Sequence, residues 1–396
     1  MSRMDRLRSA WVLQARIPLE PLCSRIRPAV FTKDEGGKLE PFLALGHRYL
    51  GAPQDTVILD SPASMANRME EALYALRAEL GLNDIRVDFG DVAYSIWQLP
   101  HRIYDAAVRD SQWSGQEFFQ TDLGKKLALG DPQALFQWSP NSLLFGSWNS
   151  HAQAGIGARL APRIERAVLA EVLGLGPKRV PRPGSRRDPL GIPGDAPVTE
   201  AYMERAKELG IFKNDKGDKG DKEGEGDKEG QGKGKAKARG KRNALSTFGF
   251  GNVPPTLQDL DVSVQEGVLE FLCTRIPLEQ RRLPEPAQGV LVLLGLLGLA
   301  SLLERGVLHL RSGTALQVGR VALRAFPGEE EFSLPPKEEL IGGIKALLEE
   351  LPEGWRWTGE ELVLTPLPAL KEIYEGQHQL RADTKRKRAV GGRKEG

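Results

Sequence analysis

One segment limits the folds open to this chain of 396 residues: residues 214–242 contain no apolar residue except alanine. Their repeating Lys, Asp and Gly cannot bury enough apolar surface to offset the entropy of ordering the backbone, so we expect the segment to be disordered. Folded structure must therefore come from the sequence on either side. The segment is typical of a flexible linker or long loop between two halves of one fold.

Charge is distributed unevenly along the chain, although the net charge is only +2. Lys plus Arg outnumber Asp plus Glu by 18 to 12 in residues 176–248 and by 7 to 2 in residues 381–396, whereas residues 249–380 are acidic, at 11 to 19. The net charge of the whole chain neither demands nor excludes binding of nucleic acid, because such binding depends on a local basic groove. We therefore expect two parts of one core, residues 1–175 and 246–380, a largely disordered insertion, residues 176–245, and a basic disordered tail, residues 381–396.

Cysteine usage and hydropathy indicate the compartment. Two cysteines, Cys23 and Cys273, give no disulfide framework and no zinc cluster, which suits a reducing cytosol. The N-terminus lacks an apolar segment long enough for a signal peptide. The most apolar run, residues 289–303, is short for a membrane span and predicts a buried helix or strand–helix element. The sequence thus predicts a cytoplasmic protein without a membrane partner.

Residues 100–174 hold most of the candidate functional side chains. Pro100 suits a first helical turn, and the residues after it continue at helical spacing, so a helix should carry His101, Arg102 and Arg109. A run of three apolar residues, 143–145, lies between a proline and a glycine and predicts a short buried strand. That strand would end at one aromatic and four hydrogen-bonding residues: Ser147, Trp148, Asn149, Ser150 and His151.

A second helix is predicted after a Gly-rich bend, because Pro162 fits only the first turn of a helix. Arg159, Arg163 and Arg166 would share one face of it, next to the free N–H groups of a helix start, and this arrangement suits phosphates. Alternatively, the arginines form a solvated face and the bend is an ordinary turn. The bend lacks the third glycine of a dinucleotide fingerprint and the Lys-Ser/Thr of a phosphate-binding loop, so we expect no cofactor.

Residues 60–81 predict an amphipathic helix with a polar cap and a proline at its start and Gly81 at its end. Asn67 and Arg68 lie off its apolar stripe, either as plain solvent-facing residues or as ligands. Arg25 and Arg27 lie in the loop after a first strand. The remaining pattern predicts strands at residues 11–17, 57–59, 85–94 and 262–275, helices at residues 200–212 and 336–351, and a hairpin at residues 355–364.

Two aromatic residues, Phe248 and Phe250, alternate with glycines shortly before Asn252 and a pair of prolines. On an exposed turn their rings would be displayed for stacking. The alternative is that both rings belong to the core at the start of a strand.

Catalysis is the weaker interpretation. Five histidines are dispersed along the chain, and none occurs in a metalloprotease motif or next to a cysteine. His101 and Asp105 are spaced to face each other on a helix, which permits an acid–base pair or two metal ligands, but no third ligand is visible. A metal- or His-dependent ribonuclease, with His101 or His151 as the general base in the second case, stays as the alternative function, although we expect no metal site.

Five motifs, in this order, resemble one known family: residues 60–73 (DSPASMANRMEEAL), 99–111 (LPHRIYDAAVRDS), 135–150 (LFQWSPNSLLFGSWNS), 157–174 (GARLAPRIERAVLAEVLG) and 248–255 (FGFGNVPP). They resemble the backbone subunit of the type I-G (formerly I-U) CRISPR Cascade complex, a member of the RAMP superfamily. The resemblance covers most of residues 25–255.

The resemblance implies an α+β protein with an RRM-like, ferredoxin-like RAMP core and large insertions, including a thumb that reaches a neighbouring copy. It also implies a non-catalytic RNA-binding protein that oligomerises along CRISPR RNA and presents the guide for pairing with target DNA. The implied partners are CRISPR RNA, further copies of the chain, other Cascade subunits and a recruited helicase–nuclease that cuts the target.

The RNA-binding residues expected from the motifs and their charge are Arg25, Arg27, Asn67, Arg68, His101, Arg102, Ser147, Trp148, Asn149, Arg159, Arg163, Arg166, Phe250 and Asn252. Arginines should pair with phosphates, asparagines should hydrogen-bond sugar or phosphate, and Trp148 and Phe250 should stack on bases. Sequence would then be read by base pairing between guide and target.

Overall fold

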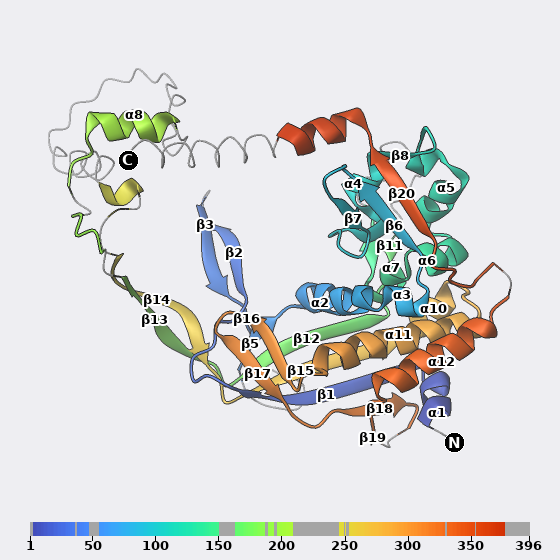
Figure 1. The fold of residues 1–396 in the computed structure, drawn as a ribbon. Coiled ribbons are helices and arrows are strands. Elements are labelled where there is room, and N and C mark those ends of the chain that lie inside the picture. Colours follow the sequence, from blue (N-terminus) through green and yellow to red (C-terminus); the bar gives the residue numbers. More distant parts are fainter. Residues whose placement is uncertain are drawn as a thin grey trace, which may run out of the picture. The chain divides into compact units, whose positions relative to one another are not determined.

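The computed structural model describes residues 3–35, 38–46, 55–149, 163–186, 189–193, 196–208, 245–248, 250, 253–328, 331–352 and 354–376. They form two compact units, the first from Met1–Val180 and Leu260–Glu372, the second from Pro181–Asp259 and Ile373–Gly396 (Figure 1). The first unit is thus built from two separate stretches of sequence, and it contains both sheets with five or more strands.

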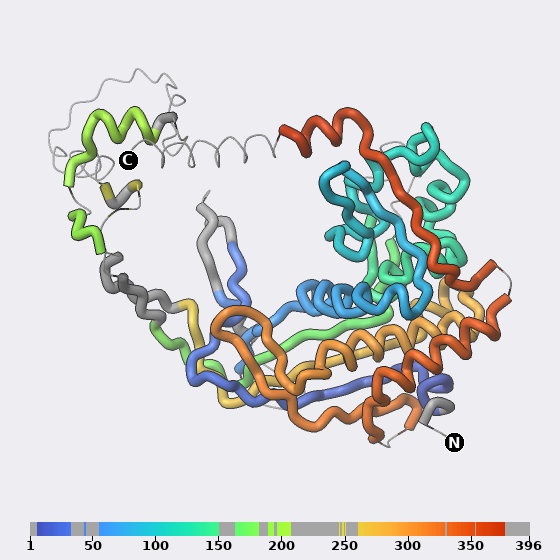
Figure 2. The backbone as a smooth tube through the Cα atoms, viewed as in Figure 1, coloured from blue at the N-terminus to red at the C-terminus, as the bar shows by residue number. Residues whose placement is uncertain are grey.

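A nine-stranded sheet forms the centre of the first unit, with strands in the order β16-β17-β1-β15-β12-β5-β4, while β18 pairs with β1 and β19 with β18. Among the described residues, neighbouring strands of this sheet pair in antiparallel fashion. Strands distant in sequence lie side by side, as the colours of Figure 2 show. The bounds are β1 Val12–Pro21, β4 Leu45–Gly46, β5 Thr56–Asp60, β12 Val168–Leu175, β15 Glu266–Thr274, β16 Val307–Arg311, β17 Thr314–Val318, β18 Ala322–Phe326 and β19 Glu331–Ser333.

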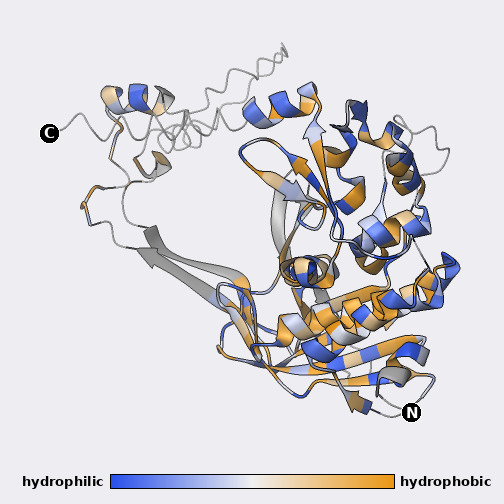
Figure 3. Cartoon of the chain, turned by 45° about the vertical axis from the view of Figure 1, so that its right-hand side comes forward, coloured by the Kyte–Doolittle hydropathy of each residue, from blue (hydrophilic) through white to orange (hydrophobic). Residues whose placement is uncertain are grey.

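Helices α2 (Pro62–Ala75) and α11 (Glu285–Leu303) cover one face of this sheet. Side chains on β1 alternate between buried and accessible, and the buried ones face the helices. A Cβ on Gly295 of α11 would lie 2.8 Å from Val168 Cγ2, so the glycine lets α11 approach β12 closely. Apolar residues concentrate between sheet and helices in Figure 3. The other helices of this layer are α1 Arg3–Ser9, α3 Arg77–Leu80, α10 Ile276–Gln280 and α12 Lys337–Glu349.

Several predicted elements are confirmed. Ser61 caps α2, the helix continues into α3 after a break at Leu76, and Gly81 ends α3 in the left-handed conformation. The apolar run near residue 290 belongs to α11, whose length and composition are enough to cross a membrane, yet residues 287–299 are all buried in the first unit. α11 is therefore the core helix that its sequence predicts.

A smaller, five-stranded sheet has the order β7-β6-β20-β8-β9, and its central pair, β20 with β6, is parallel. Short helices surround it. The bounds are β6 Asp84–Asp88, β7 Ala93–Ser95, β8 Ser111–Trp113, β9 Gln116–Glu117, β20 Glu361–Pro366, η1 Arg102–Tyr104, α4 Ala106–Arg109, η2 Phe118–Gln120, α5 Asp122–Leu129, α6 Pro132–Trp138 and α7 Pro140–Phe145. Two further two-stranded sheets are β10 (Ser147–Trp148) with β11 (Arg163–Ile164) and β2 (Val30–Glu35) with β3 (Lys38–Leu43).

Three predicted elements are wrong. Residues 143–145 form the end of helix α7 and not a strand, because Pro140 starts a helical turn that Gly146 ends. The predicted second helix is replaced by strands β11 and β12, in which buried residues of β12 pack under α11. Residues 355–364 form no hairpin, since β20 pairs instead with β6 and β8. The predicted helix at Pro100 is reduced to the 3₁₀ turn η1 and the single turn α4.

In the second unit, α8 (Glu200–Glu208) confirms the short helix predicted there, and η3 (Leu245–Phe248) follows later in the chain. Strands β13 (Lys178–Arg186) and β14 (Val253–Ser263) pair with each other and carry the chain across the unit boundary. Residues 214–242 and the basic tail lie outside the described residues.

Candidate nucleic-acid interface

A short antiparallel ribbon carries several predicted site residues on the surface. In it Trp148 of β10 lies opposite Arg163 of β11, and Ser147 lies opposite Ile164. Trp148 is 63% exposed, and Arg163 and Arg166 are also exposed. Neither arginine forms an ion pair with any residue that the structure describes. The ribbon therefore presents one planar ring opposite one unneutralised guanidinium group, and Arg166 follows two residues after the end of β11.

Gly146 makes the ribbon possible. It ends α7 with a φ of 80°, where a Cβ would lie 3.1 Å from the carbonyl oxygen of Ile164. Its N–H donates to the carbonyl of Ser142, which closes the last turn of α7. Only glycine fits this conformation and this close approach at once, so β11 passes directly beside the end of the helix.

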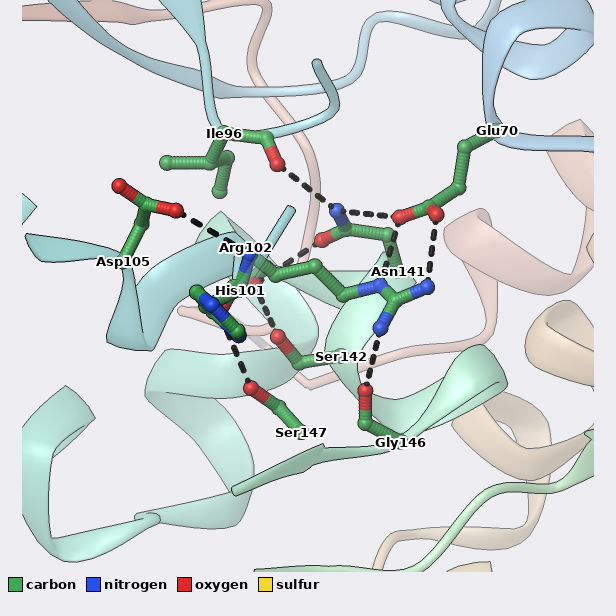
Figure 4. A network of polar contacts seen from close by, with 10 residues as sticks. Glu70, Ile96, His101, Arg102, Asp105, Asn141, Ser142, Gly146 and Ser147 are labelled. Atoms are coloured by element: carbon green, nitrogen blue, oxygen red, sulfur yellow. Dashed lines mark hydrogen bonds and ion pairs between the residues drawn. The ribbon is translucent and has the colours of Figure 1, made fainter. Parts of the chain in front are cut away.

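A buried ion pair anchors the start of the ribbon (Figure 4). Arg102 donates from Nε and Nη2 to the two carboxylate oxygens of Glu70, both at 2.7 Å, and from Nη1 to the Gly146 carbonyl at 2.8 Å. The Arg102 side chain is 12% exposed and that of Glu70 is 4% exposed. The Arg102 guanidinium is therefore engaged inside the protein and fixes Gly146 to α2, and its contact with an RNA phosphate stays a prediction.

Asn141 completes this network by donating from Nδ2 to Glu70 Oε1 at 3.0 Å and to the Ile96 carbonyl. Burial raises the pKa of Glu70, whereas hydrogen bonds and charge from Arg102, and the hydrogen bond from Asn141, act in the opposite direction. Because the carboxylate receives three donors, its burial is compensated. The network ties α2, η1 and α7 into one rigid support.

Three more predicted residues lie around this support. Ser147 donates from Oγ to the His101 carbonyl at 3.2 Å, and the His101 side chain is exposed. Asn67 is exposed on α2 one turn before Glu70, on the same face of the helix. The structure therefore brings His101 next to Ser147 of the ribbon, and it places Asn67 one turn along α2 from Glu70.

Two other predicted arginines, Arg68 and Arg27, lie at a second place, around Asp60. Arg68 donates from Nε to Asp60 Oδ2 at 2.8 Å, and Arg311 donates from Nη2 to Asp60 Oδ1 at 2.7 Å. Arg311 also donates to the Arg27 carbonyl, and Arg27 Nε lies 4.0 Å from Asp261 Oδ1. Two arginines share one fully buried carboxylate, so this cluster keeps an excess of positive charge.

Arg68 and Arg27 are thus partly committed to acids, with exposed side-chain fractions of 26% and 42%. Arg25 is exposed. Burial lowers the pKa of Arg311, and the neighbouring Arg68 lowers it further, while Asp60 raises it. The cluster contains Asp60, just before the start of α2, and Arg68, which precedes Glu70 by two residues on that helix.

The remaining predicted residues are Asn149, Phe250, Arg159 and Asn252. Asn149 is only 7% exposed, and its hydrogen bond to RNA stays a prediction. Phe250 lies in the second unit, where its ring meets that of Tyr202 edge to face at 5.2 Å, so it is packed and not freely displayed. Phe248 packs on the same ring at 5.5 Å. Arg159 and Asn252 lie outside the described residues.

Sequence reasoning missed two arginines from the second half of the chain. Arg311 is described above, and Arg281 donates from Nη2 to the Arg163 carbonyl at 2.6 Å and from Nη1 to the Gly130 carbonyl at 3.4 Å. Arg281 thereby holds β11 against the end of α5. No local pattern marks either residue, since each acts on main-chain carbonyls more than a hundred residues away.

The predicted His101–Asp105 pair has another role. The Asp105 carboxylate accepts from the main-chain N–H groups of His101 and Ala107, so it caps α4. No group of three or more metal-ligating side chains occurs within the part of the chain that the structure describes.

Comparison with protein families gives one match. Residues 13–178 match the family described as CRISPR-associated protein GSU0053 (Cas_GSU0053). Comparison with the curated proteins gives no match. The matched range contains β1, α2, the Glu70–Arg102 anchor, the Trp148–Arg163 ribbon and β12. Residues 13–178 of this chain are therefore similar to a family of CRISPR-associated proteins, which agrees with the resemblance of the motifs.

Proposed function

We propose that the protein is a non-catalytic, RNA-binding backbone subunit of a CRISPR Cascade complex of type I-G. One observation carries the proposal: the exposed Trp148 ring lies opposite the unneutralised Arg163 on a ribbon that a buried ion pair holds in place. Single-stranded RNA is bound by stacking of bases on aromatic rings and by contacts of arginine with phosphates. The Trp148–Arg163 ribbon supplies both kinds of group.

The topology supports an RRM-like core. In chain order the central elements are β1, α2, β12, β15, α11 and β17, and in the sheet the four strands lie as β17-β1-β15-β12. That is the order of the split βαβ arrangement in ferredoxin-like folds, in which each helix crosses over a strand inserted between two parallel neighbours. The smaller sheet and the second unit are then insertions into this core.

The remaining parts of the proposal follow from the family. Several copies would bind one CRISPR RNA in a row in the cytoplasm, together with other Cascade subunits, and would hold the guide for pairing with target DNA. Cutting of the target would belong to a recruited helicase–nuclease. The Asp60 arginine cluster, beside the same helix as the Glu70 anchor, would extend the phosphate-binding surface from the ribbon.

Binding of the purified protein to a short single-stranded RNA tests the proposal. Each phosphate contact contributes about 0.7 to the slope of log K against log salt concentration, so Arg163→Ala and Arg166→Ala should each flatten that slope by about this amount. Trp148→Ala should cost about 1–3 kcal/mol of binding free energy and leave the slope unchanged. Arg305→Ala, at an exposed arginine just after the end of α11, is the matched control and should change neither quantity.

Unchanged slopes in both arginine variants would remove the ribbon as the RNA site. The alternative, a His-dependent ribonuclease, rests on the exposed His101 side chain beside Ser147. Cleavage of the RNA by the wild-type protein, abolished by His101→Ala, would favour that alternative.

A further inference from the structure

The face of the central sheet that is turned away from α2 and α11 contains a hollow of about 600 Å³, where β18 lies beside β1 (Figure 1). Arg16, Arg320 and Arg324 line it, and Glu331 is the acid among its described lining residues. Arg16 is partly neutralised, since its Nε donates to Glu270 Oε1 at 3.1 Å. The volume lies within the range of small-molecule sites, about 300–1,000 Å³. The lining therefore favours a small anionic ligand.

Two of these arginines are available to such a ligand. Arg320 and Arg324 are exposed, and neither forms an ion pair within the described part of the chain. Arg324 lies opposite Glu331 in the register of β18 and β19, yet its guanidinium carbon stands over the Phe326 ring, 5.0 Å from the centroid. A guanidinium held on a ring keeps a planar fork of donors, and this geometry matches phosphate.

A second hollow, of about 300 Å³, adjoins the first, because Pro18 lines both. Gly319 shapes the border between them: its N–H donates to the Pro18 carbonyl at 2.9 Å, and a Cβ on it would lie 2.9 Å from Pro18 Cγ. Glu20 and Gln317, which are register partners on β1 and β17, are exposed in the second hollow. Glutamine pairs with the edge of adenine, and glutamate accepts from the amino group of cytosine. The two hollows together offer cations for phosphate and polar groups for a base.

Acids in both hollows limit the length of the ligand. Glu331 lines the first hollow, and Glu20 and Glu266 line the second. From Gln14 to Glu20 the site extends over about 20 Å, since a strand rises about 3.3 Å per residue. A continuous strand of nucleic acid, or an acidic protein segment, would bring further anions against these carboxylates, and like charges repel at close range. The site therefore suits a single nucleotide.

We propose that the two hollows form a binding site for a free nucleotide whose base carries an amino group, with adenine preferred. Arg320 and Arg324 hold the phosphates, and Gln317 holds the base through its amino group and a ring nitrogen. The site is separate from the Trp148–Arg163 ribbon. The inference therefore goes beyond the proposed function and does not depend on it.

Titration calorimetry with ATP and the purified full chain tests the phosphate end of the site. Arg320→Ala and Arg324→Ala should each weaken ATP binding about tenfold, which corresponds to about 1.4 kcal/mol. Arg324→Lys, which keeps the charge but loses the planar fork, should lie between the wild type and Arg324→Ala. Glu331→Gln should tighten binding about threefold, because it removes a like charge beside the phosphates. Arg305→Ala, at an exposed arginine just after the end of α11, is the control and should have no effect.

Comparison of ATP with UTP tests the base end. UTP has no amino group on its base, so it should bind about tenfold more weakly than ATP. Gln317→Ala should remove this preference by weakening ATP and leaving UTP unchanged. All the changed side chains are exposed, so each variant should keep the unfolding midpoint of the wild type. Equal binding of ATP and UTP by the wild-type protein overturns the assignment of Gln317 and of an amino-bearing base.

Other results overturn the site as a whole. An absence of saturable ATP binding at concentrations up to about 1 mM does so. A loss of ATP binding in Trp148→Ala or Arg163→Ala as large as that in Arg320→Ala would place the nucleotide on the ribbon instead. Tighter binding of oligoadenylate or of poly-glutamate than of ATP, lost in Arg320→Ala, would replace the nucleotide by a strand or by an acidic protein segment. Because the ribbon variants test RNA binding and the hollow variants test ATP binding, the two proposals fail independently.

Discussion

At the scale of single residues, the most informative side chain is Arg102, because its position in a basic motif suggests a ligand and its partners show an anchor. All three of its guanidinium nitrogens donate within the protein, two to Glu70 and one to Gly146. A mostly buried arginine of this kind stabilises the fold only as long as its partner is present. Mutation of Arg102 should therefore mainly lower the stability of the fold, whereas mutation of Arg163 should mainly affect RNA binding.

Replacing Arg102 by alanine should lower the free energy of unfolding by about 3–5 kcal/mol, because Glu70 is left as an uncompensated buried charge. Arg163→Ala should change it by less than about 0.5 kcal/mol, as expected for an exposed residue. Denaturant unfolding followed by circular dichroism measures both. The double variant Glu70→Leu/Arg102→Met removes both charges and should recover part of the loss; no recovery would mean that the ion pair is not the source of the effect.

Asp84 gives a prediction about pH. Burial raises its pKa from 3.8 to about 6, against the hydrogen bond from Ser95 and the charge of Arg77. The folded protein then binds this proton more tightly than the unfolded chain, so the contribution of Asp84 to stability is complete below pH 3.8 and is lost as pH rises through about 6. The slope is at most about 1.4 kcal/mol per pH unit.

Unfolding free energies of wild type and Asp84→Asn, compared from pH 4 to pH 7, isolate this contribution from that of other acids. The difference between the two proteins should shift in favour of the variant as pH rises. A difference independent of pH would show that Asp84 titrates at an ordinary value.

At the scale of elements, the junction between α7 and the ribbon decides how Trp148 and Arg163 are presented. Gly146 occupies a backbone conformation that is essentially restricted to glycine, with φ 80° and ψ 157°. Its Cβ position is also blocked by the Ile164 carbonyl and by Arg166. The pairing of β10 with β11 therefore depends on one residue without a side chain.

Gly146→Ala should cost about 1–3 kcal/mol of stability from backbone strain and should also weaken RNA binding, because the ribbon must shift. Gly81→Ala is the matched control. Gly81 also has a positive φ, of 65°, but no atom lies within 4 Å of its Cβ position. Gly81→Ala should therefore lower stability but leave RNA binding unchanged. If Gly146→Ala binds RNA with normal affinity, RNA binding does not depend on the geometry of the ribbon.

Prediction from sequence succeeded for elements whose own residues include caps or a regular apolar pattern. It failed for elements whose structure depends on contacts with distant parts of the chain. Residues 60–81 show caps and an apolar stripe, and residues 262–275 alternate through Leu269, Phe271 and Cys273, so both were identified. Three apolar residues in a row, as at 143–145, fit a helix and a strand equally well. The arginine spacing near residue 163 imitated a helix, whereas the buried side of β12 is set by contact with α11.

The site was predictable to the same extent. Exposed planar and cationic groups, Trp148 and Arg163, are recognisable because such residues have few structural uses on a surface. The fate of Arg102 depends on Glu70, 32 residues away, and Arg281 and Arg311 contribute from the other half of the chain. No window of local sequence contains those partners.

At the scale of the whole molecule, the central sheet interleaves both halves of the sequence. β15, from residues after the insertion, lies between β1 and β12 and pairs with each of them along eight residues. The range that matches the CRISPR-associated family, residues 13–178, contains β1 and β12 but not the strand between them. The range that matches the family is therefore only part of the first unit.

A fragment of residues 1–180 should not fold by itself, because β1 and β12 would each lose the partner strand that joins them. Circular dichroism and a denaturant titration should show no cooperative transition. Adding a second fragment, residues 260–372, should restore a transition, since the two stretches together make up the first unit. Cooperative unfolding of the first fragment alone would contradict this topology.

The pairing of β13 with β14 has a practical consequence. The chain leaves the first unit along β13 and returns to it along the neighbouring strand β14. The sequence between these two strands is therefore an insertion that is not part of the first unit. A fluorescent protein or an affinity handle grafted between residues 213 and 242 would ride on this stem. Such a label would mark single copies of the protein without a change in the sequence of the first unit.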